Sequence, residues 1–171
     1  MAANGDSVRR ELTALLPRLR RFGRTLTRNA DEADDLVQTA LERALRNLDG
    51  WQPGTRLDAW MFRIMRNAWI DEVRSRSVRA RVHAPPEAGE TVGGGGADAM
   101  ETRLEAQRVI VAMEQLPEEQ RVAIALVLVE GLSYKEAAEM LDVPIGTLTS
   151  RLARGRSALE TMLLGSPGES A

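Results

Sequence analysis

Several residue types on which enzymes and secreted proteins depend are missing or scarce in this chain of 171 residues. It has no cysteine, which excludes disulfide scaffolds, zinc–thiolate sites, iron–sulfur clusters and thiol nucleophiles. His83 is its single histidine, so a Ser-His-Asp arrangement or a multi-histidine metal site is hard to assemble. We therefore expect no catalytic residues, no metal site and no cofactor.

Long apolar runs are absent as well. No segment approaches the roughly 18 apolar residues that span a bilayer, and the first residues, MAANGDSVRREL, lack the apolar stretch of a signal peptide. The sequence thus predicts a cytoplasmic protein without membrane insertion. Its hydrophobic content of 43% is nevertheless sufficient for packed cores, in one ordinary domain or two small ones.

Charge is distributed unevenly, although the net charge is only −2. Residues 1–83 hold 16 arginines against 11 acidic side chains, whereas residues 84–171 carry more acidic than basic groups. Lys135 is the only lysine among the 23 basic residues. Because the arginine fork suits phosphates and base edges, this composition is compatible with contacts to nucleic acid.

A segment rich in glycine and proline divides the chain. Residues 84–98, APPEAGETVGGGGAD, contain five glycines, two prolines and no large apolar residue except Val92, so they cannot form a core. This composition is typical of a flexible linker. We therefore expect a first domain at 1–83, an acidic linker at 84–100, a second domain at 101–165 and a disordered tail at 166–171.

Apolar residues recur at three- and four-residue steps on both sides of the linker, and strand-like alternation is absent. The pattern predicts an all-α fold with two small helical domains. Helices are expected at 8–27, 31–48 and 56–76 in the first domain. The second domain should contain four helices. They are expected at 100–116, from Pro117 to a stop at Gly131, at 133–141 and at 145–164. The last two form a helix-turn-helix.

The helix expected at 145–164 has two contrasting faces. An apolar face contains Leu148, Leu152, Gly155 and Leu159. The opposite face offers short hydroxyls and arginines, which a helix in the major groove of DNA needs for base edges and phosphates. The alternative is an ordinary amphipathic surface helix. The predicted DNA contacts are Thr147, Thr149, Ser150, Arg151, Arg154 and Arg156.

The helix expected at 56–76 has large apolar groups on one broad arc and arginines and an amide on the other side. The residues of the apolar arc are Leu57, Trp60, Met61, Ile64, Met65 and Ala68. Arginine and amide groups beside aromatic rings can hold unstacked bases, and arginines that follow can bind phosphates. Alternatively, the tryptophans are core and the arginines a solvated face. We assign Trp60 to the core and leave Trp69 open. The candidate contacts are Arg63, Arg66, Asn67, Ile70, Arg74 and Arg76.

The helix expected at 31–48 presents a polar face that is either solvated or a protein-docking surface. Its residues are Asp34, Asp35, Gln38, Thr39 and Glu42. Adjacent carboxylates on a helix point about 100° apart, so Asp34 and Asp35 do not converge on one substrate.

Four motifs in order resemble the signatures of bacterial sigma factors of the extracytoplasmic function group. They are DEADDLVQTALERA (31–44), WMFRIMRN (60–67), LPEEQR (116–121) and VPIGTLTSRLARGR (143–156). The segment LPRLRRFGRTLT (16–27) further resembles the general-stress-response subgroup. Thr149 and Ala153 depart from the family, which often has a basic and a bulky residue there.

The resemblance implies a non-catalytic subunit of RNA polymerase that directs the core enzyme to −35 and −10 promoter elements and helps to melt the latter. By analogy, the polar face at 34–42 would dock on the clamp of the largest polymerase subunit. The 56–76 helix would bind the −10 element, with Asn67 in the base pocket, and the 145–164 helix the −35 element. A small anti-sigma protein would inhibit it.

Two other interpretations stay open at this point. A stand-alone helix-turn-helix regulator would bind duplex DNA without polymerase, as a dimer on spaced half-sites. A sigma-like decoy would titrate an anti-sigma protein, and it would need degraded DNA-contact positions. The DNA-contact positions are intact, which disfavours the decoy: they include Arg63, Arg66, Asn67 and Arg154.

Overall fold

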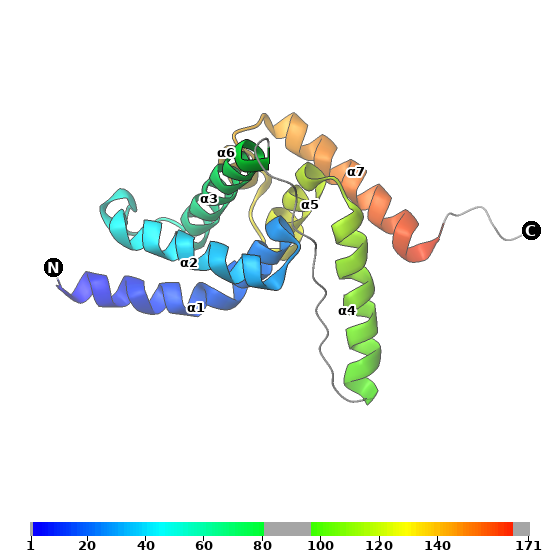
Figure 1. Cartoon of the computed structure of the whole chain (residues 1–171), viewed down its shortest axis with the longest axis horizontal. Coiled ribbons are helices and arrows are strands. Elements are labelled where there is room, and N and C mark those ends of the chain that lie inside the picture. Colours follow the sequence, from blue (N-terminus) through cyan, green and yellow to red (C-terminus); the bar gives the residue numbers. More distant parts are fainter. Residues whose placement is uncertain (1, 81–96, 166–171) are drawn as a thin grey trace, which may run out of the picture. The chain divides into compact units, whose positions relative to one another are not determined.

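The computed structural model describes residues 2–80 and 97–165, which are almost entirely helical and contain no β-strand (Figure 1). These residues fall into two compact units, one on each side of Gly89. The predicted all-α class with two helical domains is thereby confirmed. Most of the predicted linker, residues 84–96, and the predicted tail lie outside the described residues.

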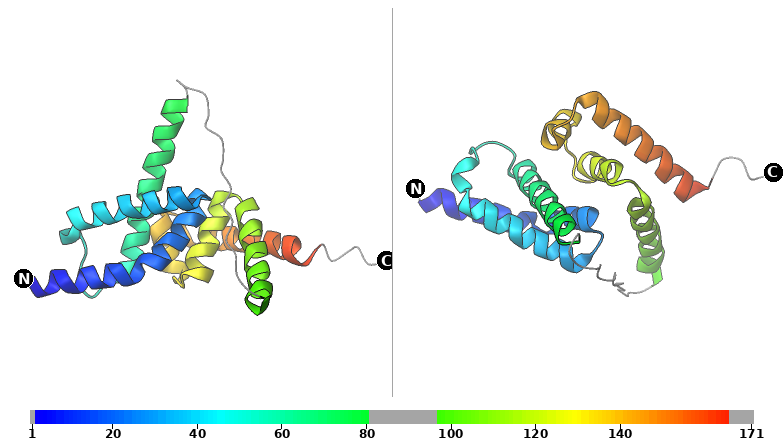
Figure 2. Two further views of the ribbon diagram at one scale, coloured as in Figure 1. Left: turned by 60° about the horizontal axis from the view of Figure 1, so that its bottom comes forward. Right: turned by 45° about the horizontal axis from the view of Figure 1, so that its top comes forward.

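The first unit consists of α1 (Ala2–Thr27), α2 (Ala30–Arg46), a 3₁₀ turn (Leu48–Gly50) and α3 (Leu57–Ala80). Each of the three α-helices packs against the other two. Its core is built around Phe22 and Phe62, whose tilted rings have centroids 5.0 Å apart. The C-terminal half of α3 extends beyond α1 and α2 (Figure 2), and the side chains from Val73 to Arg79 are exposed there.

The connection between α1 and α2 is tight because two residues redirect the backbone. Arg28 adopts a left-handed conformation (φ 61°). Asn29 then caps α2, and its side-chain oxygen accepts hydrogen bonds from the backbone N–H groups of Asp31 and Glu32. A Cβ atom at Gly23 would lie 3.2 Å from the Cβ of Ala33. The two helices therefore approach one another closely here.

The buried surface of α3 differs from the expected arc. Phe62, which was not placed in that arc, is fully buried, and Trp69 is only 9% exposed. Trp60 is half-buried, so its assignment to the core was wrong. The reason is that α3 packs against both α1 and α2. A helix with two partners buries more than one stripe, and its rotation cannot be read from a single apolar face.

The second unit contains α4 (Ala97–Gln115), α5 (Glu118–Ile124), a π-helical turn (Ala125–Val129), α6 (Tyr134–Leu141) and α7 (Ile145–Leu164). The helix that begins after Pro117 ends before Gly131, whose φ of +72° suits glycine. Ser133 and Glu136 form the predicted capping box at the start of α6. The core of the second unit includes Leu116, Leu126, Leu148 and Leu152, all fully buried.

Candidate nucleic-acid and polymerase interfaces

Helix α7 is held by its apolar face against the rest of the second unit. It packs on α4, α5 and α6. Leu148 and Leu152 are almost completely inaccessible, Gly155 is buried, and Leu159 is half-buried. The predicted apolar face is therefore the face that packs, and the hydroxyl and arginine side of the helix is left toward the surface.

Most of the predicted DNA contacts lie on this outer side of α7. Thr149, Ser150, Arg154 and Arg156 are exposed, and Thr147 is half-buried. The hydroxyls of Thr149 and Ser150 donate to backbone carbonyls one turn earlier, at 2.8 and 3.0 Å. Their oxygen atoms therefore remain available as acceptors for base donors. Arg154 and Arg156 have no acidic partner in the described residues, so their guanidinium groups can bind phosphate or a base edge.

Arg151 is placed differently from the other two arginines of α7. Its side chain is 19% exposed, and Nη2 lies 3.0 Å from Oε1 of Glu119 on α5. It is thus paired within the unit rather than directed outward.

The candidate contacts on α3 differ in exposure and in their partners. Arg63, Asn67 and Arg74 are exposed, and Arg66 and Ile70 are half-buried. Arg76 is exposed too, but it is engaged by acidic side chains. Its guanidinium contacts Glu72 at 2.9 Å and Glu32 of α2 at 3.1 Å, and it lies 5.7 Å from the ring centre of Trp69.

These contacts change both the titration and the role of Arg76. The hydrogen bond with Glu72 is the main cause that raises the pKa of Arg76 above its usual value; partial burial opposes this rise, and the contacts with Glu32 add to it. Because the pairs join α3 to the first turn of α2, Arg76 stabilises the helix pair as well as offering a positive charge. Binding a phosphate there requires exchange of these partners.

A cluster that the sequence analysis missed lies at the start of α3. Asp58, whose side chain is 12% exposed, accepts hydrogen bonds from Arg18 of α1 at 2.9 Å and from Arg56 at 2.8 Å. It also accepts one from the backbone N–H of Ala59. Burial alone would raise the pKa of Asp58, but the hydrogen bonds from Arg56, Ala59 and Arg18 lower it to about 2. Arg18 comes from 40 positions earlier, so no local pattern signals this cluster.

The Asp58 cluster secures the turn that leads into α3. The turn is closed by Thr55, whose N–H and hydroxyl both donate to the carbonyl of Gln52. Gly54 has a φ of +88°, a conformation that favours glycine. Arg56 then connects this turn to Asp58, and Asp58 connects it to α1.

The polar face of α2 is exposed as predicted, at Asp34, Asp35, Gln38, Thr39 and Glu42. Asp34 pairs with Arg20 of α1 at 3.1 Å, and Glu42 pairs with Arg46 one turn later at 3.6 Å. Leu45, 50% exposed, lies beside this face. The combination of acidic, amide and apolar groups suits a protein partner better than DNA, because the carboxylates would repel phosphates.

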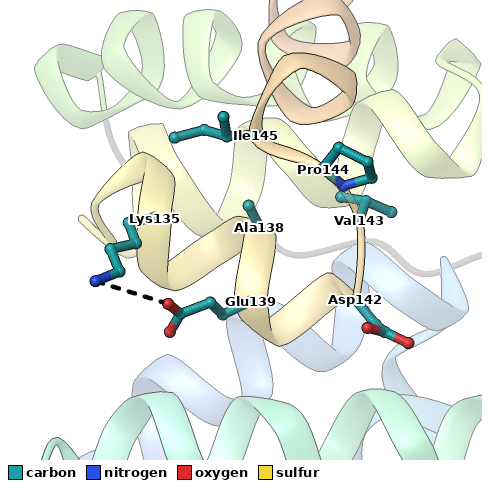
Figure 3. Close-up of a pocket in the computed structure, with 7 residues that line it drawn as sticks. All are labelled: Lys135, Ala138, Glu139, Asp142, Val143, Pro144 and Ile145. Carbon is teal, nitrogen blue, oxygen red and sulfur yellow. Dashed lines mark ion pairs between the residues drawn. The ribbon is translucent and has the colours of Figure 1, made fainter.

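An open hollow of about 400 Å³ lies where α6 turns into α7, lined by the seven residues drawn in Figure 3. The dashed line in Figure 3 marks an ion pair between Lys135 and Glu139, whose Nζ and Oε1 atoms are 4.0 Å apart. Within residues 2–80 and 97–165 there is no group of three or more acidic or histidine side chains that could hold a metal, and no helix of that part could cross a membrane.

Comparison with known families identifies both units. The sigma-70 region 2 family matches residues 12–79, and the sigma-70 region 4 family matches residues 106–159. The chain is 40% identical over 164 residues to the sigma factor EcfG of Rhodopseudomonas palustris, covering 92% of this chain and 86% of that protein. The chain belongs to the extracytoplasmic function sigma factors.

Further relatives and solved structures agree with this family. SigM of Mycobacterium tuberculosis is 36% identical to this sigma factor, with 85% and 71% of the two chains covered. The fold is similar to that of the sigma factor RpoE from Bartonella quintana, solved with the anti-sigma factor NepR, with a TM-score of 0.77, 32% identity and coverage of 94% and 98%. It is also similar to CnrH, solved with the cytosolic domain of CnrY (TM-score 0.63, 25% identity, coverage 92% and 90%).

The family matches coincide with the two units of this sigma factor. Region 2 covers most of α1, all of α2 and nearly all of α3, and region 4 extends from within α4 into α7. The exposed faces of α2 and α3 thus lie in region 2, and that of α7 lies in region 4. The resemblance inferred from the four motifs is confirmed at the level of the family.

Proposed function

We propose that this sigma factor is the promoter-specificity subunit of a bacterial RNA polymerase, acting without catalysis of its own in the cytoplasm, where polymerase and chromosome meet. The observation that carries the proposal is that regions 2 and 4 fold as separate units, and that α3 in the first and α7 in the second each carry exposed arginines. Two separate DNA-binding units can engage two promoter elements at once, and linkage makes their joint affinity exceed that of either.

In the second unit, α7 is the helix that reads the −35 element in the major groove. Arg154 and Arg156 supply free guanidinium groups, and Thr147, Thr149 and Ser150 supply acceptor oxygens. A good bidentate contact contributes about 1–3 kcal/mol of discrimination between bases. Few such contacts are therefore enough for a specific −35 interaction.

In the first unit, α3 binds the −10 element and stabilises its melted form. Arg63, Asn67 and Arg74 are exposed on this helix, with Arg66 and Ile70 at the edges of the exposed surface. The amide of Asn67 can both donate to and accept from the edge of a flipped base. Arg76 contributes to the positive field while it remains tied to Glu32 and Glu72.

The polar face of α2 docks on core RNA polymerase, at the clamp of its largest subunit. The docking residues are Asp34, Asp35, Gln38, Thr39 and Glu42, with Leu45 as an apolar neighbour. Since the carboxylates disfavour DNA, a protein surface with complementary charge explains their exposure.

An anti-sigma protein is the second protein partner that we propose, after core polymerase. Two solved structures similar to this chain are sigma factors in complex with anti-sigma factors. The similarity to EcfG, together with the 16–27 motif, favours membership of the general-stress-response subgroup.

Reconstituted transcription tests this function directly. The purified chain is mixed with core RNA polymerase and fragmented genomic DNA, and the 5′ ends of the transcripts are sequenced. We expect discrete start sites that need the protein and share two upstream elements. A stand-alone regulator would instead shift duplex DNA without polymerase, and a decoy would produce no new start sites.

Two charge-reversal variants separate polymerase docking from folding. Changing Asp35 and Glu42 together to arginine should abolish binding to core polymerase, because both carboxylates lie on the exposed face of α2. The matched control is Glu11→Arg, which reverses an exposed charge on α1. If the double variant binds core polymerase as tightly as this control does, the α2 face is not the docking site.

A further inference from the structure

The arginine of α7 that is withdrawn from the surface points to a residue outside the DNA-contact set. Arg151 is 19% exposed at its side chain, and its guanidinium lies 3.0 Å from Glu119, which is itself 70% exposed. Arg154, three positions later, is exposed and has no acidic partner in the described second unit. The two arginines therefore face different surroundings although they lie on the same helix.

The pair is one end of a close contact between α5 and α7. One helical turn after Arg151, a Cβ at Gly155 would lie 2.5 Å from Cδ1 of Ile124 and 3.3 Å from Cβ of Gln120. At Gly155 the backbone of α7 therefore lies directly against side chains of α5. The Glu119–Arg151 pair joins the two helices one turn earlier. Two contacts one turn apart fix the rotation of α7 about its own axis as well as its distance from α5.

This rotation matters more for recognition than for stability. An ion pair with an exposed partner adds little to folding free energy. Hydrogen bonds to base edges, however, weaken steeply when their length or angle departs from the favoured range. A small rotation of α7 would therefore weaken its base contacts without unfolding the unit.

We propose that Glu119 is a positioning residue for −35 recognition, which holds Arg151 against α5 so that α7 presents its outer face at the correct rotation. Arg151 then acts within the protein and makes no phosphate contact. The pairing also neutralises a carboxylate that would otherwise repel DNA beside the helix. The proposal rests on the proposed role of α7 in −35 binding.

The test is promoter binding by holoenzyme, reconstituted from core polymerase and the full chain, over a series of salt concentrations. The variants are Glu119→Gln, Arg151→Gln, their combination, and Arg154→Gln as a matched change of a free arginine. Two promoters are compared, one with the native −35 element and one with a single substituted base pair. The readouts are the salt slope and the ratio of the two affinities.

Arg154→Gln should reduce the salt slope by about 1, because one phosphate contact is lost. Arg151→Gln should leave the slope unchanged and lower the affinity ratio by about tenfold, the size of coupling expected between contacting residues. Glu119→Gln should do the same, and the double variant should be no worse than either. The charge swap Glu119→Arg with Arg151→Glu should recover most of the ratio.

Three results would overturn the proposal. A slope reduced by about 1 in Arg151→Gln would show that Arg151 contacts DNA directly. An unchanged affinity ratio in Glu119→Gln, with Arg154→Gln still defective, would remove the positioning role alone and leave the function of α7 intact. If Arg154→Gln is also silent in both readouts, α7 does not read the promoter, and the −35 assignment fails together with the inference.

Discussion

The Asp58 cluster allows a quantitative prediction for the variant Asp58→Asn. Asparagine preserves the shape of the side chain but removes the charge that Arg18 and Arg56 contact. Arg18, whose side chain is 31% exposed, then loses the charge of Asp58. We expect the first unit to be destabilised, with the turn that leads into α3 loosened as well.

The magnitude follows from the pKa of Asp58. A fall from 3.8 to about 2 corresponds to about 2.4 kcal/mol of unfolding free energy. Because Arg56 is 40% exposed at its side chain, solvent screening reduces the effect, and we expect a loss of about 1–1.5 kcal/mol at pH 7. A lowered folded-state pKa gives stability that is present above 3.8 and is lost as the pH falls toward about 2. The difference between wild type and variant should therefore shrink between about pH 4 and pH 2.

Urea unfolding followed by tryptophan fluorescence measures this difference in the first unit alone. The three tryptophans of the chain, Trp51, Trp60 and Trp69, all belong to that unit. The control is Asp71→Asn, which breaks a more exposed pair with Arg43, where the two side chains are 56% and 41% exposed. We expect the control to cost less than about 1 kcal/mol.

The comparison can refute the reasoning in two ways. Equal losses in Asp58→Asn and Asp71→Asn would mean that the additional hydrogen bonds and the lower exposure of Asp58 contribute nothing. The free energies of unfolding of wild type and Asp58→Asn should also be compared at about pH 2.5, near the folded-state pKa. If their difference there is as large as at pH 7, the carboxyl of Asp58 is not held at a lowered pKa.

Three further predictions concern packing and capping. Phe62→Ala should destabilise the first unit by about 3–5 kcal/mol, because the ring is fully buried against Phe22; the tryptophan transition measures it, and a loss below about 1 kcal/mol would contradict the core assignment. Ser133→Ala should cost about 1 kcal/mol in the thermal unfolding of the second unit followed by circular dichroism, and Ser133→Thr should retain the cap. Gly155→Val should lower that transition by about 1–3 kcal/mol and leave the tryptophan transition unchanged; a shift in both would show that the units unfold together.

The helices themselves could be predicted from the sequence because each is specified locally. The capping box at Ser133, the stop at Gly131 and the apolar face of α7 all depend on residues within one or two turns. The beginning of α1 was placed six residues too late, since its first six residues, AANGDS, carry no apolar period. Helix ends are the least determined feature of such patterns.

The buried surface of α3 shows what a local pattern cannot provide. Sequence periodicity gives one apolar face per helix, whereas α3 contacts α1 and α2 on different sides. Phe62 and Trp69 therefore became buried outside the expected arc, and Trp60 stayed half-buried. The positions of neighbouring helices, rather than the residues of α3, determine these outcomes.

The arginines of the candidate interfaces follow the same rule and show how it bears on function. In the sequence, Arg76 and Arg151 look equivalent to Arg74 and Arg154 as basic residues near a predicted DNA-binding face. In the structure Arg76 and Arg151 are held by acidic residues, among them Glu32 and Glu119 from other helices. Arg74 and Arg154, in contrast, are exposed and have no acidic partner among residues 2–80 and 97–165.

Each free arginine that binds a phosphate releases counterions, whereas an arginine that exchanges one anion for another contributes less to the salt slope. Arg74→Gln and Arg154→Gln should therefore each lower the slope of promoter binding by about 1, and Arg76→Gln by clearly less. A loss in Arg76→Gln as large as that in Arg74→Gln would mean that DNA displaces Glu32 and Glu72, and that these pairs hold Arg76 only until the promoter is bound.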